Sequence, residues 1–389
     1  IYMPWTFYHW VEAFAALDDL LPPEPRARWS QALELGFNGI CRETAENQHV
    51  HNIPTWRAMS LVRAGQIFEK DNWLEVGRQG IYRAADAQSP DGYWPEGGGP
   101  TTSYNFVYVH ALGLYYHFTG DERVLEPLRR ATEFHVAFTY PDGSPVETVD
   151  GRVPYSNSAR IVGLPGFLQF PEGRALSRLI LDALWADFQK AQEKAEATGG
   201  TVSSAPPHAA TAFQLIDQIA DATEAQIPQR MERNESVYRG RAAVLKRGPF
   251  YACLSGYLTP TEDLWWTLEE RWIKSRQNYI SLWHDRLGLL LGGGNSKYSP
   301  KYSTFNILRG RRHTPVADRA EIEIVQGGAG LDLLYDGVRC EAVVQVLDEA
   351  TVRVRFAAQI KEERRDQDTR CAARLTVLLH PGEKLTYRG

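Results

Sequence analysis

Apolar residues recur at helical spacing through roughly the first 235 positions of the chain. In the run 54–68, for example, Trp56, Met59 and Ile67 fall on one face of a helix. Loops rich in glycine and proline separate these runs and carry the unusual polar residues. The pattern predicts a series of helical hairpins, with helices over residues 5–21, 26–35, 54–68, 72–87, 101–118, 122–138, 174–197 and 209–225.

Residues that favour helix ends mark several of these boundaries. Gly36 and Gly120 follow the last apolar positions of their helices, where a glycine readily takes the left-handed conformation. Asn72 and Asp121 stand where an N-cap side chain can accept a backbone N–H. The Tyr-Pro-Asp-Gly sequence at 140–143 predicts a turn.

The pattern changes near Arg239, after which short apolar runs alternate with turn residues. Residues 351–356 show the clearest alternation of polar and apolar side chains. Many short strands with frequent turns are typical of an antiparallel sandwich. We therefore expect an α+β multidomain chain, with a helical domain over 1–235 and a β-sandwich domain over 236–389. Its predicted strands cover 242–245, 250–257, 279–283, 287–291, 321–325, 331–335, 341–347, 351–357 and 373–379.

Composition narrows the classes of protein that fit this layout. With 43% hydrophobic and 23% charged residues over 389 positions, the chain has enough apolar material for a sizeable core. A net charge of −5 argues against nucleic-acid binding through a basic surface. No apolar run is long enough for a bilayer, so no membrane span is expected. The start, Ile1-Tyr2-Met3-Pro4, has no basic-then-apolar leader, and we expect that a signal segment was removed or the chain was trimmed.

Cysteines and aromatic residues add two further points. Cys41, Cys253, Cys340 and Cys371 are widely separated and form no CxxC pair, so a zinc knuckle is not expected and the redox compartment stays open. The chain holds 11 tryptophans and 18 tyrosines, whose flat faces suit sugar rings. Filling a helical core is nevertheless the commoner role of any single aromatic side chain.

Two amides and two imidazoles crowd the segment Asn47-Gln48-His49-Val50-His51-Asn52, just before the predicted helix 54–68. No acidic or thiol ligand stands at a fixed spacing from them, so no metal is expected, and no other cofactor is indicated. Capping and loop hydrogen bonds are one interpretation of this segment. The favoured one is an active-site loop whose amides and imidazoles polarise a carboxylate or take a proton.

A second unusual segment runs from Asp91 to Gly99, with a tight turn, an aromatic pair, a lone carboxylate and a glycine run. Tyr104 follows it in the first turn of a predicted helix, where its hydroxyl can reach a cleft. To act as a base, this tyrosine needs a pKa below its usual value near 10, which a cationic or hydrogen-bonding neighbour provides. Tyr108 and Tyr115 on the same face are interpreted as core residues.

Further polar residues lie in loops. Arg160, in the polar segment 155–160 with Tyr155, can bind a carboxylate through two hydrogen bonds, although a surface salt bridge is equally compatible. In the β half, polar residues flank the predicted strand 279–283 on both sides. The glycine run at 292–294 lacks the spacing of a phosphate-binding loop.

These segments together resemble the toroid-plus-sandwich polysaccharide lyases of the heparinase II/III and alginate-lyase type. In that family an Asn/His loop precedes one helix, and a DG…E…(S/G)-Y-H segment further along supplies the catalytic tyrosine. Asn47-Gln48-His49 matches the first, and Asp91-Gly92…Glu96…Ser103-Tyr104-Asn105 the second, with Asn105 where histidine is usual. The resemblance covers residues 40–300 or so. It implies an N-terminal incomplete (α/α) toroid followed by a C-terminal antiparallel β-sandwich.

The resemblance also implies β-elimination on a uronic-acid polysaccharide. Asn47 and His49, with Arg160, would neutralise the uronate carboxylate, and Tyr104 would act as both base and acid, or as the acid with His49 as base. Glu96 would orient a partner and Trp94 would stack on a sugar. The family often brings a sandwich histidine into the cleft. The residues implied to contact substrate are Trp94, Glu96, Asn105, Tyr155 and Arg160, with Arg276, Asn278 or His284 from the sandwich.

The expected partner is an acidic polysaccharide, without nucleic acid or membrane, in a periplasmic or secreted setting. Few clustered basic residues favour an unsulfated alginate- or glucuronan-like substrate. The exact linkage and the oligomeric state stay open. One alternative is an (α/α)-barrel glycoside hydrolase, which needs two nearby carboxylates. Another is a carbohydrate-binding protein that uses aromatic residues alone. Candidate carboxylates for the hydrolase are Glu43, Glu46, Asp91 and Glu96.

Overall fold

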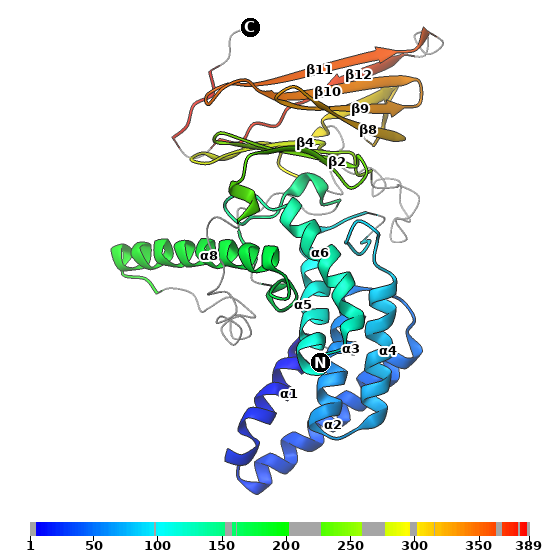
Figure 1. The fold of residues 1–389 in the computed structure, drawn as a ribbon, viewed down its shortest axis with the longest axis vertical. Coiled ribbons are helices and arrows are strands. Elements are labelled where there is room, and N and C mark those ends of the chain that lie inside the picture. The colour runs from blue at the N-terminus through cyan, green and yellow to red at the C-terminus, as the bar shows by residue number, and fades with distance from the viewer. Residues whose placement is uncertain are drawn as a thin grey trace.

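The computed structural model describes residues 5–96, 99–151, 158–160, 162–201, 227–258, 277–295, 302–314, 316–362, 368–379 and 382–386. Helices fill the N-terminal half and antiparallel strands the C-terminal half (Figure 1). The predicted order, a helical half followed by a β half, is confirmed. Among the described residues, no helix is long and apolar enough to cross a bilayer.

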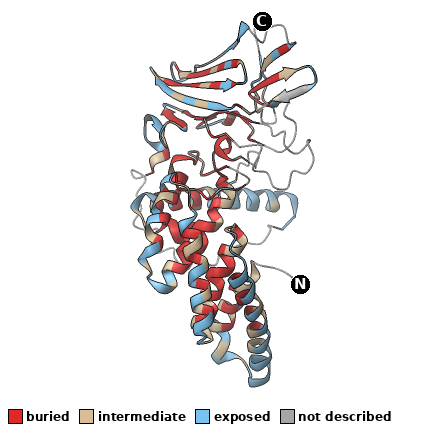
Figure 2. Ribbon diagram, turned by 90° about the vertical axis from the view of Figure 1, so that its right-hand side faces the viewer, coloured by how far each residue is buried: buried red, intermediate tan, exposed pale blue. Residues whose placement is uncertain are grey.

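Successive hairpins arrange the helices in an inner and an outer row. Along the inner row α1 packs on α3, α3 on α5 and α5 on α7, whereas α2 and α4 pack together outside. Most residues of α3 are buried, and most of α2 are exposed (Figure 2). This alternation is that of an incomplete (α/α) toroid. The helices are α1 (Thr6–Leu17), α2 (Pro23–Glu46), α3 (Asn52–Ile67), α4 (Asp71–Asp86), α5 (Thr102–Thr119), α6 (Leu125–Ala137), α7 (Leu164–Phe167) and α8 (Pro171–Thr198), with 3-10 turns η1 (Asp18–Leu20), η2 (Glu122–Val124), η3 (Glu147–Val149) and η6 (Pro228–Arg230).

Some predicted helix ends are confirmed and others are wrong. Gly120 ends α5 in the left-handed conformation, and the Asp121 side chain accepts a hydrogen bond from a backbone N–H of η2. In contrast, α2 continues through Gly36. A Cβ at this position would lie 2.6 Å from the Phe7 ring, so the glycine permits the close approach of α1 instead of ending the helix. Asn72 does not cap α4, since its amide donates to the sulfur of Cys41. The helix predicted over 209–225 lies outside the described residues.

Among the described residues, the strands form three antiparallel sheets with the orders β1-β2-β3-β4-β5, β11-β10-β9-β8 and β12-β6-β7. The predicted sandwich is confirmed, although β1, β6 and β7 were not anticipated. The strand predicted over 373–379 is wrong, because the strand in this part of the chain, β12, covers Thr369–Ala373. The strands are β1 (Arg233–Val237), β2 (Ala242–Arg247), β3 (Phe250–Ser255), β4 (Ile280–His284), β5 (Gly288–Leu291), β6 (Phe305–Arg309), β7 (Arg312–Thr314), β8 (Arg319–Val325), β9 (Gly328–Tyr335), β10 (Val338–Val346), β11 (Val352–Ile360) and β12 (Thr369–Ala373).

The five-stranded sheet is covered on both faces. On one face, residues such as Leu254 and Ile280 pack against Leu331 of the four-stranded sheet. On the other, Tyr251 and Trp283 belong to a separate core that includes residues of α6 and the segment after it. The strands β2, β3 and β4 are therefore buried almost throughout. Within the sandwich, the five-stranded sheet is thus the layer that lies against the helical half (Figure 1).

Candidate active site

The loop between α2 and α3 presents polar side chains at the surface. Helix α2 ends at Glu46, and the side-chain oxygen of Asn47 accepts a hydrogen bond from the backbone N–H of His49 at 2.9 Å. Such a side-chain-to-backbone bond stabilises a tight turn after the helix. Asn47 and His49 are both exposed as a result. An amide and an imidazole thus stand together where a ligand can reach them.

Glu96 brings the second segment against this loop. Its Oε1 lies 3.2 Å from Nε2 of His51, with the Glu96 side chain only 2% exposed and that of His51 34% exposed. The His49 and His51 rings lie nearly parallel, 6.1 Å apart. His51 is extended, so residues two apart in this stretch point to the same side. The two segments recognised in the sequence therefore meet in space.

His51 makes this contact, and it was absent from the predicted site residues. The signal that favours it is its position two residues after His49 in the same loop. Because a buried carboxylate needs a polar or cationic partner, the lone Glu96 also pointed to an unassigned neighbour.

Trp94 is not available to a sugar, so its predicted stacking role is wrong. The residue is 1% exposed. Its ring stacks on Tyr108 with centroids 4.8 Å apart and planes 3° from parallel. Its indole N–H donates to the backbone oxygen of Ala84 at 2.6 Å. Both the face and the polar edge of Trp94 are used within the core.

Asn105 is also a core residue, and its predicted contact with substrate is wrong. Its side-chain oxygen accepts the backbone N–H of Trp94 at 3.1 Å, and its amide nitrogen lies 3.0 Å from Nε2 of His135. Complete burial lowers the pKa of His135 to about 3, so this imidazole is neutral and its Nε2 can accept from Asn105. Asn105 therefore holds the 91–96 segment to the start of α5.

Tyr104 is the third residue of α5 and is half-buried. The first turn of this helix is fixed by Asp150, whose Oδ2 accepts from Thr102 Oγ1 at 3.0 Å and from the backbone N–H of Ser103 at 3.3 Å. A carboxylate is favourable at a helix N-terminus, where backbone N–H groups lack partners within the helix. Asp150 lies far along the chain, and no local pattern in the sequence indicates this contact.

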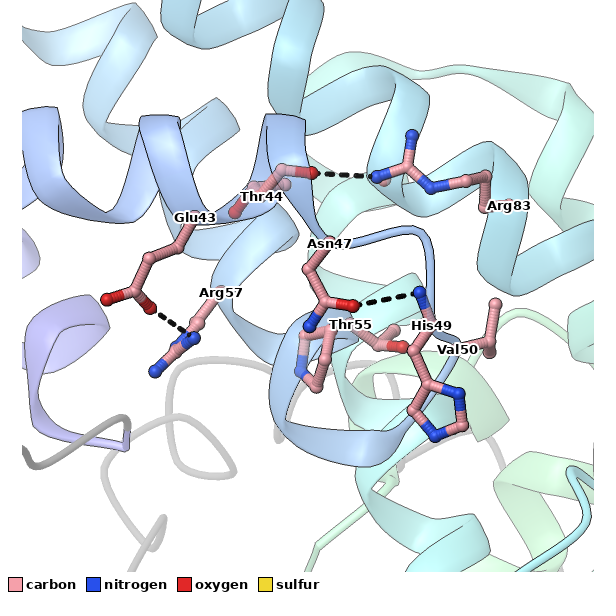
Figure 3. Close-up of a pocket in the computed structure, with 10 residues that line it drawn as sticks. Glu43, Thr44, Asn47, His49, Val50, Thr55, Arg57 and Arg83 are labelled. Atoms are coloured by element: carbon pink, nitrogen blue, oxygen red, sulfur yellow. Dashed lines mark hydrogen bonds and ion pairs between the residues drawn. The ribbon is translucent and has the colours of Figure 1, made fainter.

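A hollow opens beside Asn47 and His49 (Figure 3). The Arg57 guanidinium on α3 donates to the Glu43 carboxylate at 2.6 Å, and Arg83 of α4 donates to the Thr44 carbonyl at 3.0 Å. Burial lowers the pKa of Arg57 from its usual value, but an arginine remains charged at neutral pH. Two guanidiniums thus line the hollow, and the sequence interpretation had omitted both. The residues around it are Glu43, Thr44, Asn47, His49, Val50, Pro54, Thr55, Arg57, Gly80 and Arg83.

The sandwich residues predicted to reach the substrate serve other purposes. The Asn278 amide, 4% exposed, donates to the Gly294 carbonyl at 2.5 Å. The His284 ring packs against Phe250 with centroids 5.1 Å apart, and its Nδ1 accepts the backbone N–H of Arg286. Phe250 belongs to the core between the sheets, so His284 faces away from the helical half. Their predicted roles in substrate binding are therefore wrong.

No contact among the described residues brings Arg160 to the site. Arg160 lies half-buried in the short segment 158–160. Tyr155 and Arg276 lie outside the described residues. Over the described parts of the chain, no three His, Cys, Asp or Glu side chains cluster in a way that could hold a metal ion.

Comparison with known proteins yields solved structures only. No protein-family model matches the chain, and no curated protein sequence does. Similar structures include the Streptomyces coelicolor A3 chondroitin AC lyase in complex with chondroitin sulphate, at 13% identity and a TM-score of 0.46 over 87% of this chain and 53% of that one. A mutant heparan sulfate lyase HepC from Pedobacter heparinus is 11% identical to this chain, with a TM-score of 0.47 over 88% of this chain and 51% of that one. A mutant of the Streptomyces enzyme is 14% identical, with a TM-score of 0.46 over 88% of this chain and 54% of that one. The chain spans about half the length of each.

Proposed function

We propose that the chain is a polysaccharide lyase that cleaves a uronic-acid polysaccharide by β-elimination. The contact between Glu96 and His51 is the observation that carries this proposal. It joins the exposed loop of Asn47 and His49 to the segment that leads into Tyr104. An amide, imidazoles, a phenol and nearby guanidiniums are the groups that removal of a proton next to a carboxylate requires.

The first requirement of this reaction is to neutralise the uronate carboxylate. The C5 proton lies next to that carboxylate and is only weakly acidic, so the enolate-like intermediate must be stabilised. Asn47 and His49 supply an amide and an imidazole for this purpose. Arg83, which lines the same hollow, adds positive charge that attracts the anionic sugar, whereas the charge of Arg57 is compensated by Glu43.

The second requirement is proton transfer. In this proposal Tyr104 removes the C5 proton and returns a proton to the leaving O4, or His49 is the base and Tyr104 the acid. The Glu96 carboxylate lies 3.2 Å from Nε2 of His51 and so fixes the orientation of that ring. His51, nearly parallel to His49, then positions the loop rather than reacting itself.

The proposed substrate is an unsulfated polyuronate of the alginate or glucuronan type, met in the periplasm or outside the cell. The hollow holds Arg83 and the Arg57–Glu43 ion pair, a small positive charge that suits one carboxylate, whereas sulfate groups would call for more basic side chains. A screen of alginate, glucuronan, hyaluronan, chondroitin sulphate and heparan sulfate, followed by ultraviolet absorbance of the unsaturated product, ranks these substrates directly.

Replacement of the proposed proton carrier tests the mechanism. Tyr104→Phe removes the hydroxyl and keeps the ring, so we expect kcat to fall by about 10²–10⁴-fold with little change in KM. The rate is followed by the absorbance of the new double bond on the best substrate of the screen. Tyr116→Phe, on the same helix and also half-buried, should keep the wild-type rate.

Other outcomes would assign a different function. Full activity of Tyr104→Phe would refute the assigned role of this hydroxyl. New reducing ends without new absorbance would indicate the glycoside hydrolase, for which Asp91 is poorly suited because it accepts hydrogen bonds from Arg241 and Tyr257. Binding without turnover would indicate a carbohydrate-binding protein.

A further inference from the structure

Two cysteines meet between sheets of the sandwich. Cys340 lies on β10 of the four-stranded sheet, and Cys371 lies on β12 of the three-stranded sheet. Their sulfur atoms are 3.6 Å apart, although the residues are separated by 31 positions in the chain. Cys340 is fully buried and Cys371 is partly exposed. The pair thus has one inner thiol and one that a reagent can reach.

The other two cysteines have different surroundings. The Cys41 sulfur accepts a hydrogen bond from the Asn72 amide in the helical half. Cys253 lies fully buried on β3, where burial raises the pKa of its thiol to about 12. Cys253 belongs to a different core cluster from Cys340, and Cys41 lies in the helical half, so both provide internal controls.

We propose that Cys340 and Cys371 form a redox site, at which a disulfide links the four-stranded and the three-stranded sheets. A disulfide requires sulfur atoms about 2.05 Å apart, so the observed sulfurs must approach by about 1.5 Å, which side-chain rotation supplies. Because strands of different sheets carry the two residues, the bond would staple the β12-β6-β7 sheet to the centre of the four-stranded sheet.

The oxidation balances as two successive thiol–disulfide exchanges with a small-molecule disulfide such as oxidised glutathione. The Cys371 thiolate attacks one sulfur of the oxidant and releases one glutathione thiolate. The Cys340 thiol then attacks the Cys371 sulfur, and its proton goes to the second glutathione, which leaves as a thiol. Two protein thiols are oxidised and one disulfide is reduced to two thiols.

The electrostatics agree with this order of events. The hydrogen bond from the Cys340 thiol lowers the pKa of Cys371, whereas the same contact and burial raise the pKa of Cys340. The more exposed sulfur is therefore the more readily ionised one, as expected of the sulfur that meets the oxidant first. The buried sulfur completes the bond.

The test counts thiols in the whole chain after treatment of the folded, reduced protein with oxidised glutathione. We expect the four thiols to fall to two once the product is denatured, with Cys340 and Cys371 joined in the non-reduced peptide map. The oxidised protein should also melt about 5 °C higher, because the cross-link restricts the unfolded chain. Cys41→Ser should fall from three thiols to one in the same way.

Several results would overturn the proposal. These are four thiols that persist, a disulfide between other cysteines, or a stable glutathione adduct on Cys371 with Cys340 still free. In Cys371→Ser the remaining thiols should stay at three and the melting temperature should no longer rise on oxidation. Should this variant fold poorly, Cys371→Ala gives the same readout without a hydroxyl.

Discussion

Asn105 and His135 form a polar pair in otherwise apolar surroundings. The His135 ring lies 4.1 Å from the Phe106 ring and 5.2 Å from the Phe167 ring, centroid to centroid. No charged partner among the residues that the structure describes compensates this burial, so the neutral form of the imidazole is strongly favoured. Through Asn105, this neutral ring helps to hold the backbone of Trp94 and the segment that carries Glu96.

Protonation of His135 should therefore couple stability to pH. Folding lowers the pKa of His135 from 6.5 to about 3. Between these two pH values His135 is protonated in the unfolded chain and neutral in the folded chain. The free energy of unfolding should fall by up to about 1.4 kcal/mol per pH unit on acidification from pH 6.5 toward pH 3. At pH values above this window the contribution is constant.

His135→Gln isolates this contribution, since the glutamine oxygen can accept from Asn105 but does not titrate in this range. We expect urea denaturation at about pH 7, 6 and 5 to show a shallower loss of stability for the variant than for the parent chain. Buried histidines elsewhere contribute equally to both proteins. Parallel slopes for the two proteins would contradict the assignment.

At this scale, the sequence predicted the exposure of the loop that carries Asn47 and His49, but not the burial of the segment that carries Trp94. Asn47 and His49 are exposed, as an active-site loop requires, because the turn that presents them is built from their own neighbours. Trp94 and Asn105 were misassigned, since the partners that bury them, Tyr108 and His135, lie elsewhere in the chain. The type of a residue does not reveal which side of a fold it faces.

The start of α5 is the element on which the proposed chemistry depends. Thr102 and Ser103 both donate to the Asp150 carboxylate, which is 1% exposed. Its negative charge and its two acceptor contacts set the direction of the first helical turn. Tyr104 follows directly, so any relaxation of this turn moves the phenol.

Asp150→Asn should separate this positioning role from simple stability. The asparagine keeps one oxygen but loses the charge, and we expect about 1 kcal/mol lower stability and about tenfold lower kcat. Substrate turnover and urea denaturation measure the two effects. Asp121→Asn removes the charge of the carboxylate that follows the C-terminal end of α5, and it should lower stability with kcat unchanged. Equal turnover in the two variants would remove Asp150 from the positioning of Tyr104.

Element boundaries were predictable where the signal is local. Gly120 and Asp121 act through their own backbone neighbours, and the sequence identified both. The predicted role of Gly36 was wrong, because the residue lies within α2 and its missing side chain makes room for the Phe7 ring. The short polar strand β1 pairs at the sheet edge with β2, and without an apolar alternation it gave no strand signal.

At the scale of the molecule, polar contacts join the two halves along one side of the five-stranded sheet. Asp91 accepts from Arg241 at 2.8 Å, and Glu147 accepts the backbone N–H of Gly293 at 3.2 Å. The change from helical to strand periodicity near Arg239 predicted the order of the halves. It did not predict that strand β3 is buried on both sides, because that depends on how the halves dock.

Asn295 is the central polar residue of this junction. Its amide donates to the backbone oxygens of Thr148 and Asp150 at 3.2 and 2.7 Å, while its side-chain oxygen accepts the backbone N–H of Asn278 at 2.7 Å. The residue is 1% exposed, so these partners lose their hydrogen bonds if the side chain is removed. Asn295 thereby links the sandwich to the residue that fixes the start of α5.

Asn295→Ala should weaken both the junction and catalysis. Each buried group left unpaired costs about 1–3 kcal/mol, so we expect the melting temperature to fall by about 5 °C or more. Calorimetry should show the single transition broaden or split as the halves uncouple, and kcat should fall because Asp150 loses a support. Asn234→Ala removes one exposed hydrogen bond within the sandwich and should change neither property. If the two variants melted alike, docking of the sandwich would not depend on Asn295, and the link from sandwich to Tyr104 would have to run through other contacts.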